Sequence, residues 1–159
     1  MESINPYKTF AEFVKTNFHS EQQILDVGCG SGELCTILYK YGYKVTGMDR
    51  ENYSKIFLDN NITFINNQFT LSTDITLYDL IIGFHPCEAA ELIIRNSLKN
   101  DKECIVTLCE IHQGLEKKDI RSRKEYINYL MNISEKLKMV KLPIHGDNDL
   151  WNETIYYKK

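Results

Sequence analysis

Residues 24–32, Ile-Leu-Asp-Val-Gly-Cys-Gly-Ser-Gly, place a short apolar run directly before three glycines spaced two apart. Glycine loses more conformational freedom on folding than any other residue, so such a cluster costs stability unless the backbone requires it. A turn of this kind between a strand and a helix brings bare backbone and free N–H groups close to a ligand. Gly28, Gly30 and Gly32 therefore predict a ligand-binding turn.

The composition describes an ordinary globular chain. It has 159 residues, 43% of them hydrophobic and 26% charged, with a formal net charge of −3. This balance excludes a strong overall attraction to nucleic acid or to acidic membranes. We expect one domain over residues 1–159, no secretory signal, no membrane span and a cytoplasmic location. The five cysteines form no CxxC pair, which favours reduced thiols.

Hydrophobic periodicity predicts helices that alternate with strands. We expect helices over residues 6–18, 33–41, 53–58, 88–98 and 124–137, and strands over residues 22–27, 44–48, 62–65, 78–82, 104–109, 139–144 and 153–157. The last two strands flank the turn-rich residues 146–152 and should pair antiparallel. The other crossovers predict an α/β fold with a mostly parallel, doubly wound sheet, which binds ligands beyond the carboxyl ends of its strands.

An acidic residue follows the glycine turn at the distance expected for a ribose-binding carboxylate. The strand over residues 44–48 leads to Asp49, close to the ~20 positions at which a carboxylate binds ribose hydroxyls in nucleotide-binding folds. The glycines and Asp49 together indicate a nucleoside-containing cofactor. The alternative is that the glycines only form a tight turn and that Asp49 caps the next helix.

The residues Asp-Val-Gly-Cys-Gly-Ser-Gly, followed by Val-Thr-Gly-Met-Asp-Arg, resemble the first two motifs of class I S-adenosylmethionine-dependent methyltransferases. That family has a Rossmann-like seven-stranded sheet with a reversed last strand. The resemblance implies that S-adenosylmethionine is the cofactor and S-adenosylhomocysteine the product. It also implies that the backbone of Gly28, Cys29 and Gly30 passes the methionine portion, that Asp26 lies near its amino group, and that Asp49 binds both ribose hydroxyls.

The segment after the third strand departs from the family pattern. Many members carry an aspartate there that accepts a hydrogen bond from the adenine amino group, and Gln68 aligns with it. An amide oxygen accepts the same bond, and Phe69 is placed to lie against the purine. A polar loop beside a core phenylalanine is the alternative. The full predicted cofactor set is Asp26, Gly28, Cys29, Gly30, Gly32, Asp49, Arg50, Gln68, Phe69 and Phe84.

The acceptor side follows the fourth strand, in residues 83–91, Gly-Phe-His-Pro-Cys-Glu-Ala-Ala-Glu. This segment shares one proline with the [N/D]-P-P-[Y/F] motif of amino-methyltransferases, and it is similar to the HPDxATE segment of small methyltransferases without an assigned substrate. His85 is the candidate catalytic base, since imidazole accepts protons near neutral pH. A structural hydrogen bond beside Pro86 is the alternative. Glu88 and Glu91 either orient a substrate or, as we favour, stabilise the N-terminus of the next helix.

Two further clusters of residues are each open to a structural and a functional interpretation. Residues 117–124 form a basic run, which is typical of a solvated surface and less often of a phosphate contact. Cys87, Cys109 and His112 lack the spacing of a structural zinc site, so we predict no metal and buried free cysteines instead.

The sequence as a whole predicts a methyltransferase-like domain in which an N-terminal helix, residues 1–20, precedes a cofactor-binding core, residues 21–159. The acceptor is a small molecule or an RNA nucleotide, with no signal for DNA. One alternative is a nicotinamide-dependent oxidoreductase, which the glycine spacing and the lack of a Tyr-x-x-x-Lys pair disfavour. Another is a non-catalytic cofactor-binding or partner subunit.

Overall fold

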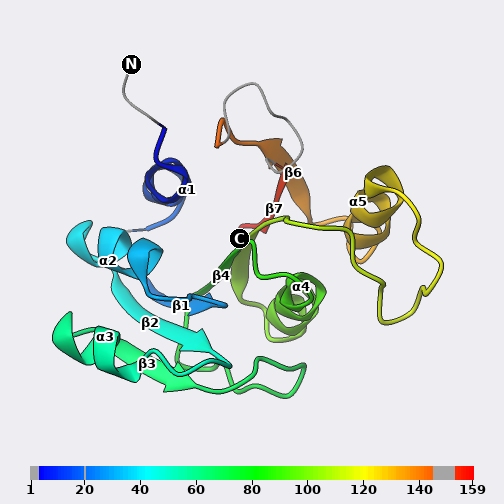
Figure 1. The fold of residues 1–159 in the computed structure, drawn as a ribbon. Coiled ribbons are helices and arrows are strands. Elements are labelled where there is room, and N and C mark those ends of the chain that lie inside the picture. Colours follow the sequence, from blue (N-terminus) through cyan, green and yellow to red (C-terminus); the bar gives the residue numbers. More distant parts are fainter. Residues whose placement is uncertain (1–3, 20, 145–152) are drawn as a thin grey trace.

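A seven-stranded sheet with helices on both faces forms the centre of the computed structural model, which describes residues 4–19, 21–144 and 153–159 (Figure 1). The strands are β1 (Gln23–Val27), β2 (Lys44–Asp49), β3 (Thr63–Asn66), β4 (Leu80–Phe84), β5 (Glu103–Thr107), β6 (Lys138–Lys141) and β7 (Glu153–Tyr157). The helices are α1 (Pro6–Asn17), α2 (Glu33–Lys40), α3 (Ser54–Asp59), α4 (Ala89–Lys99) and α5 (Arg123–Met131).

The order of the strands confirms the predicted fold class. It is β3-β2-β1-β4-β5-β7-β6, in which β1 to β5 are parallel to one another. β7 lies between β5 and β6 and is antiparallel to both. The last strand is therefore reversed, and the predicted antiparallel pairing of β6 with β7 is confirmed.

The two faces of the sheet bury separate apolar clusters. On one face, residues such as Phe10 of α1, Leu34 of α2 and Phe57 of α3 are buried together. On the other, Ile93 of α4 and Tyr126 of α5 belong to the second cluster, and Figure 1 shows these helices on opposite sides of the strands. None of the helices in the described ranges is both long and apolar enough to traverse a lipid bilayer.

Four predicted elements have wrong boundaries. The strand expected over residues 78–82 runs from Leu80 to Phe84. The helix expected over residues 124–137 ends at Met131, because Ser134 accepts a hydrogen bond from the Lys136 N–H (3.1 Å) and begins a turn. The fifth strand ends at Thr107 and leaves Cys109 in the following segment. β6 ends at Lys141 rather than at residue 144. The turn predicted at 146–152 lies outside the described residues.

Candidate functional site at the carboxyl ends of the strands

The three glycines of the turn all have positive φ, but the space around each of them differs. A Cβ on Gly28 would lie 3.5 Å from the Pro86 backbone, whereas one on Gly30 would have no heavy atom within 4 Å. A Cβ on Gly32 would lie 2.6 Å from the Phe57 ring. Gly28 and Gly30 line the two cavities described below, whereas Gly32 lines neither of them and packs against Phe57 instead.

Asp49 lies at the end of β2 and holds the glycine turn in place. One carboxylate oxygen accepts the N–H of Gly30 (2.9 Å), and the other accepts the N–H of Glu51 (2.9 Å). The cap of α3 is Tyr53, so Asp49 does not take the alternative role of helix cap. A carboxylate has about four lone-pair sites, which leaves Asp49 able to accept further hydrogen bonds from a ligand.

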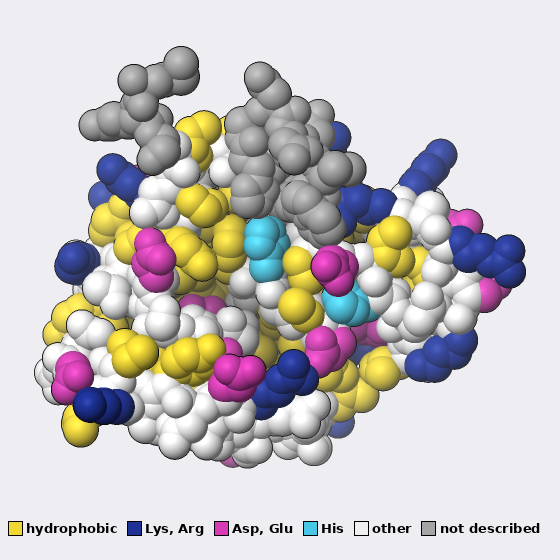
Figure 2. All heavy atoms as spheres, in the orientation of Figure 1, with side chains coloured by type: hydrophobic (Ala, Val, Ile, Leu, Met, Phe, Trp, Pro, Cys, Tyr) yellow, Lys and Arg dark blue, Asp and Glu magenta, His cyan; other side chains and the backbone are white. Residues whose placement is uncertain are grey.

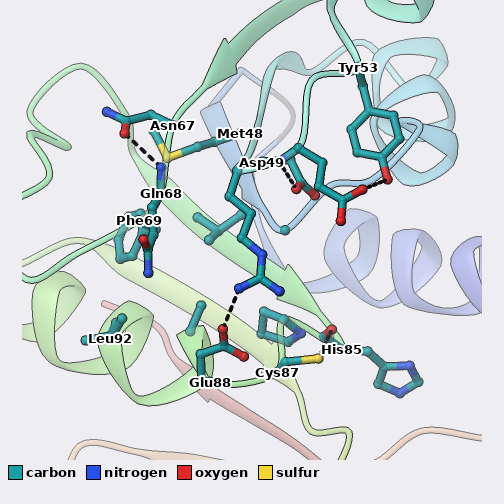
Figure 3. Close-up of a pocket in the computed structure, with 16 residues that line it drawn as sticks. Met48, Asp49, Tyr53, Asn67, Gln68, Phe69, His85, Cys87, Glu88 and Leu92 are labelled. Atoms are coloured by element: carbon teal, nitrogen blue, oxygen red, sulfur yellow. Dashed lines mark hydrogen bonds and ion pairs between the residues drawn. The ribbon is translucent and has the colours of Figure 1, made fainter.

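The first cavity, of about 250 Å³, lies between the end of β2 and the start of α4. Its lining includes the predicted residues Gly28, Asp49, Arg50, Gln68, Phe69 and His85. Figure 3 shows Asp49 on one side of this cavity and Glu88 on the other, with Gln68 and Phe69 contributed by the segment after β3. Arg50 and Glu88 form an exposed ion pair (3.1 Å) between the two sides. Phe69 is also part of the apolar core.

The second cavity, also of about 250 Å³, adjoins the first, because Gly28 and His85 line both. Its other predicted residues are Asp26, Cys29, Gly30 and Phe84. Asp26 is 2% exposed and accepts the Cys35 thiol (3.1 Å). Burial raises the pKa of Asp26 to about 7, and the charge of Asp49 acts in the same direction. A cationic ligand group would offset this cost.

Several residues that line the two cavities were not predicted from the sequence. Tyr7 of α1 joins the second cavity because its ring packs against Phe84, with a centroid distance of 5.1 Å. Tyr53 and Asn67 line the first cavity. The Asn67 side chain accepts the Gln68 N–H (2.8 Å) and so orients the Gln68 backbone. Only the position of Tyr53, a few residues after Asp49, offered a local hint.

The segment after β4 has unusual backbone geometry. His85 and Cys87 both have φ of 53°, on either side of Pro86. Left-handed backbone at residues other than glycine costs about 1–3 kcal/mol and tends to occur at functional sites. The His85 N–H donates to the Thr107 carbonyl (3.0 Å), and its ring packs against Phe84 at 4.3 Å. In Figure 3 the imidazole points away from Glu88 and Gln68.

The two glutamates of this segment have separate roles. Glu88 pairs with Arg50 at the first cavity and makes no side-chain cap of α4. Glu91 is 4% exposed and accepts hydrogen bonds from Arg95 Nε (2.7 Å), the Tyr129 hydroxyl (2.6 Å) and the Leu115 N–H (2.9 Å). Glu91 therefore connects α4 to α5 and to the segment after β5, rather than acting only at the helix N-terminus.

The basic run is partly structural. Arg123 is bound to Glu153, and its Nη1 donates to the Cys109 carbonyl (2.6 Å). Lys117, Lys118 and Arg121 are exposed, as a solvated surface run predicts.

Cys87, Cys109 and His112 converge at the same edge of the sheet, each with a ligand-type atom within 4.8 Å of the others. The prediction that these cysteines are buried is wrong for Cys87, which is exposed, and for Cys109, which is half-buried; all five cysteines of the chain are free. Figure 2 shows histidine side chains beside hydrophobic and acidic side chains in the middle of this face. The spacing in the sequence did not reveal this cluster, because its members come from two segments that follow different strands.

Comparisons with solved structures place this fold among methyltransferases. The methyltransferase domain of bacterial CtHen1 superposes with a TM-score of 0.67 and 16% identity, covering 96% of this chain and 97% of that one. The ribosomal protein L11 methylase from Lactobacillus delbrueckii subsp. bulgaricus gives 0.65 and 17%, covering 97% and 77%. Magnesium protoporphyrin IX methyltransferase from Synechocystis PCC 6803, with bound SAM, gives 0.64 and 13%, covering 96% and 78%.

No curated protein matches the chain by sequence. A family model described as a methyltransferase domain does match, over residues 5–98. This match extends from α1 to α4 and includes the glycine turn, Asp49 and His85, and so contains most of both cavities. With that match over more than half of its length, the chain belongs to the methyltransferase domain family.

Proposed function

We propose that the protein binds S-adenosylmethionine across the two adjoining cavities and transfers its methyl group to an acceptor. The observation that carries this proposal is the placement of Asp49 in the first cavity and Asp26 in the second, with Gly28 and His85 where the cavities meet. An adenosyl sulfonium ligand has ribose hydroxyls at one end and an ammonium group at the other, so it suits two separated carboxylates.

The residues present fit this cofactor. Gly30 leaves open space where a side chain would stand, and Asp49 fixes the turn while retaining acceptor sites for ribose hydroxyls. We assign the adenine amino group to the side chain of Gln68, which lines the first cavity. Asp26 is assigned to the amino group of the methionine portion, because a cation favours the ionised form of a buried carboxyl.

When bound, S-adenosylmethionine supplies a methyl group on a positively charged sulfur, which an acceptor atom displaces in line. The residues of the protein then have to position the acceptor and, where needed, remove its proton. His85 is our candidate for the group that removes this proton, since it lines both cavities. The strained backbone around Pro86 supports a functional role for this residue.

The acceptor is a small molecule or an RNA nucleotide. The structural neighbours include a magnesium protoporphyrin IX methyltransferase and a ribosomal protein L11 methylase, so the shared fold accommodates different acceptors. A screen of a metabolite pool and bulk transfer RNA with radiolabelled S-adenosylmethionine would separate the two classes.

The cofactor assignment is tested by the Asp49→Ala variant. Loss of two charge-assisted hydrogen bonds, each worth about 1.5–3 kcal/mol, should weaken S-adenosylhomocysteine binding by more than about 100-fold in calorimetric titration. Asp59→Ala, an exposed aspartate at the end of α3, is the matched control and should bind normally. A folded Asp49→Ala protein with unchanged affinity would refute the ribose assignment.

The role of His85 is tested once an acceptor is known. His85→Ala should bind S-adenosylhomocysteine normally but transfer methyl groups about 10²–10⁴-fold more slowly, the usual contribution of acid–base catalysis. His19→Ala, which removes an exposed histidine after α1, is the control and should leave turnover unchanged. Near-normal turnover in His85→Ala would remove His85 from the mechanism.

A further inference from the structure

Two segments that follow neighbouring strands bring thiol and imidazole groups together. β4 ends at Phe84 and β5 at Thr107, and these two residues are paired in the parallel register. Cys87 and Cys109 come shortly after these paired ends, and His112 follows Cys109 in the same segment. Because parallel neighbours end at the same edge, the three side chains meet although Cys87 is far from the others in sequence.

The distances suit a transition-metal ion. Cys109 Sγ lies 3.8 Å from His112 Nε2, and the ligand-type atoms of all three residues lie within 4.8 Å of one another. Zinc bonds of about 2.3 Å to sulfur and 2.0–2.1 Å to nitrogen place two tetrahedral ligands roughly 3.5–3.8 Å apart. The present separations therefore need only small side-chain rotations to close around one ion.

Packing and hydrogen bonds hold the segment that carries Cys109 and His112 in place. Arg123 donates to the carbonyl of Cys109 (2.6 Å), and the ring of His112 packs edge-on against Tyr126, with a centroid distance of 6.1 Å. The side chain of Gln113 exchanges two hydrogen bonds with the backbone of Ile120 (2.9 and 3.0 Å). These contacts position the backbone of Cys109 and the ring of His112, and so reduce the ordering required on binding.

The backbone at Cys87 supports a functional position for this residue. Its left-handed φ of 53° is uncommon for a residue other than glycine and persists only where the local structure enforces it.

We propose that Cys87, Cys109 and His112 bind a zinc-class divalent ion at the edge of the first cavity. Two sulfurs and one imidazole nitrogen are ligands that zinc prefers, and magnesium and calcium do not. Three protein ligands leave a tetrahedral ion one position for water or a substrate atom. Cys87 also lines the first cavity, so the ion lies beside the site of the proposed transfer. The metal site does not depend on that reaction.

Cobalt substitution tests the proposal directly. The full-length reduced protein is stripped with a chelator and titrated with Co²⁺. The expected result is one ion per chain, with thiolate-to-cobalt charge-transfer bands and the intense visible bands of a tetrahedral site, both displaced by Zn²⁺. Absence of these bands would overturn the proposal.

Variants identify the ligands. Cys87→Ser, Cys109→Ser and His112→Ala should each weaken Zn²⁺ binding by more than about 100-fold, the upper range for losing even an outer-shell partner. His19→Ala is the matched control and should bind Zn²⁺ as the wild type does. Circular dichroism and thermal unfolding check the fold of each ligand variant without reference to the metal or to the proposed cofactor. A folded ligand variant that binds Zn²⁺ with wild-type affinity would remove that residue from the site.

Discussion

At the scale of single residues, two aspartates on neighbouring parallel strands are placed in different surroundings. Asp26 is buried in the second cavity beside the Cys35 thiol, whereas Asp49 accepts two backbone N–H groups in the first. β1 and β2 pair side by side, so the carboxylates stand at the same edge of the sheet. Their different partners suit them to different ends of one ligand.

The raised pKa of Asp26 predicts a pH-dependent affinity. Below about 7 the carboxyl is increasingly protonated in the free protein, so an ammonium group loses its partner. S-adenosylhomocysteine binding should weaken by up to about tenfold per pH unit between pH 7 and 5, as measured by calorimetry. Asp26→Asn should bind more weakly at pH 7, with a flatter profile. Identical pH profiles for the two proteins would contradict the assignment of Asp26.

The raised pKa of Asp26 also makes the stability of the folded chain depend on pH. Folding raises the pKa of Asp26 from its ordinary value of 3.8 to about 7, so the folded state binds more protons than the unfolded chain between those values. The free energy of unfolding contributed by Asp26 therefore falls as the pH rises from about 4 to about 7. A bound cationic ligand should reduce this dependence.

At the scale of elements, the segment between β5 and α5 contains no helix or strand but is anchored by specific side chains. Glu91 of α4 accepts the Leu115 N–H, and the Tyr129 hydroxyl of α5 accepts the Glu116 N–H (3.1 Å). Gly114 is needed at one contact, because a Cβ there would lie 2.3 Å from the Tyr129 ring. These contacts keep Cys109 and His112 next to the segment after β4.

Replacing the central carboxylate should loosen this arrangement. Glu91→Gln removes a charge that accepts three hydrogen bonds, and bonds to charged groups are worth about 1.5–3 kcal/mol each. We expect the free energy of unfolding in urea to fall by at least about 1.5 kcal/mol. Glu116→Gln, which changes the 74% exposed partner of Arg95, should alter it by less than about 0.5 kcal/mol. Equal effects of the two variants would argue against a role for the buried carboxylate.

At the scale of the whole molecule, the two cavities lie along the ends of strands that also separate the two apolar clusters. The first cavity includes Phe69 of one cluster, and the second includes Leu34 of the other. A ligand that occupies both cavities therefore contacts both halves of the core and should stabilise the folded chain as a unit.

Thermal unfolding measures this coupling. S-adenosylhomocysteine at a hundredfold excess over its Kd should add about 2.7 kcal/mol, which corresponds to a rise in Tm of about 5–10 °C for a chain of this size. NAD at the same concentration should cause no rise, because the glycine spacing lacks the form suited to a pyrophosphate. A shift with NAD and none with S-adenosylhomocysteine would refute the proposed cofactor.

The sequence by itself determined the features that depend on local pattern. The alternation of helices and strands, the antiparallel pairing of β6 with β7, the glycine turn and the place of Asp49 follow from periodicity and short-range spacing, which act over a few residues. Helix and strand ends were less predictable where a side chain such as that of Ser134 formed a competing turn.

Only the tertiary structure decided which remote segments meet. The pairing of Phe84 with Thr107 brings Cys87 to Cys109 and His112, and α1 packs so that Tyr7 reaches the second cavity. In the tertiary structure Gly32 also packs against Phe57, and the buried Glu91 connects α4 to α5. These contacts arise from strand register and helix packing across the sheet, which join residues far apart in the chain and leave no spacing that a sequence pattern could contain.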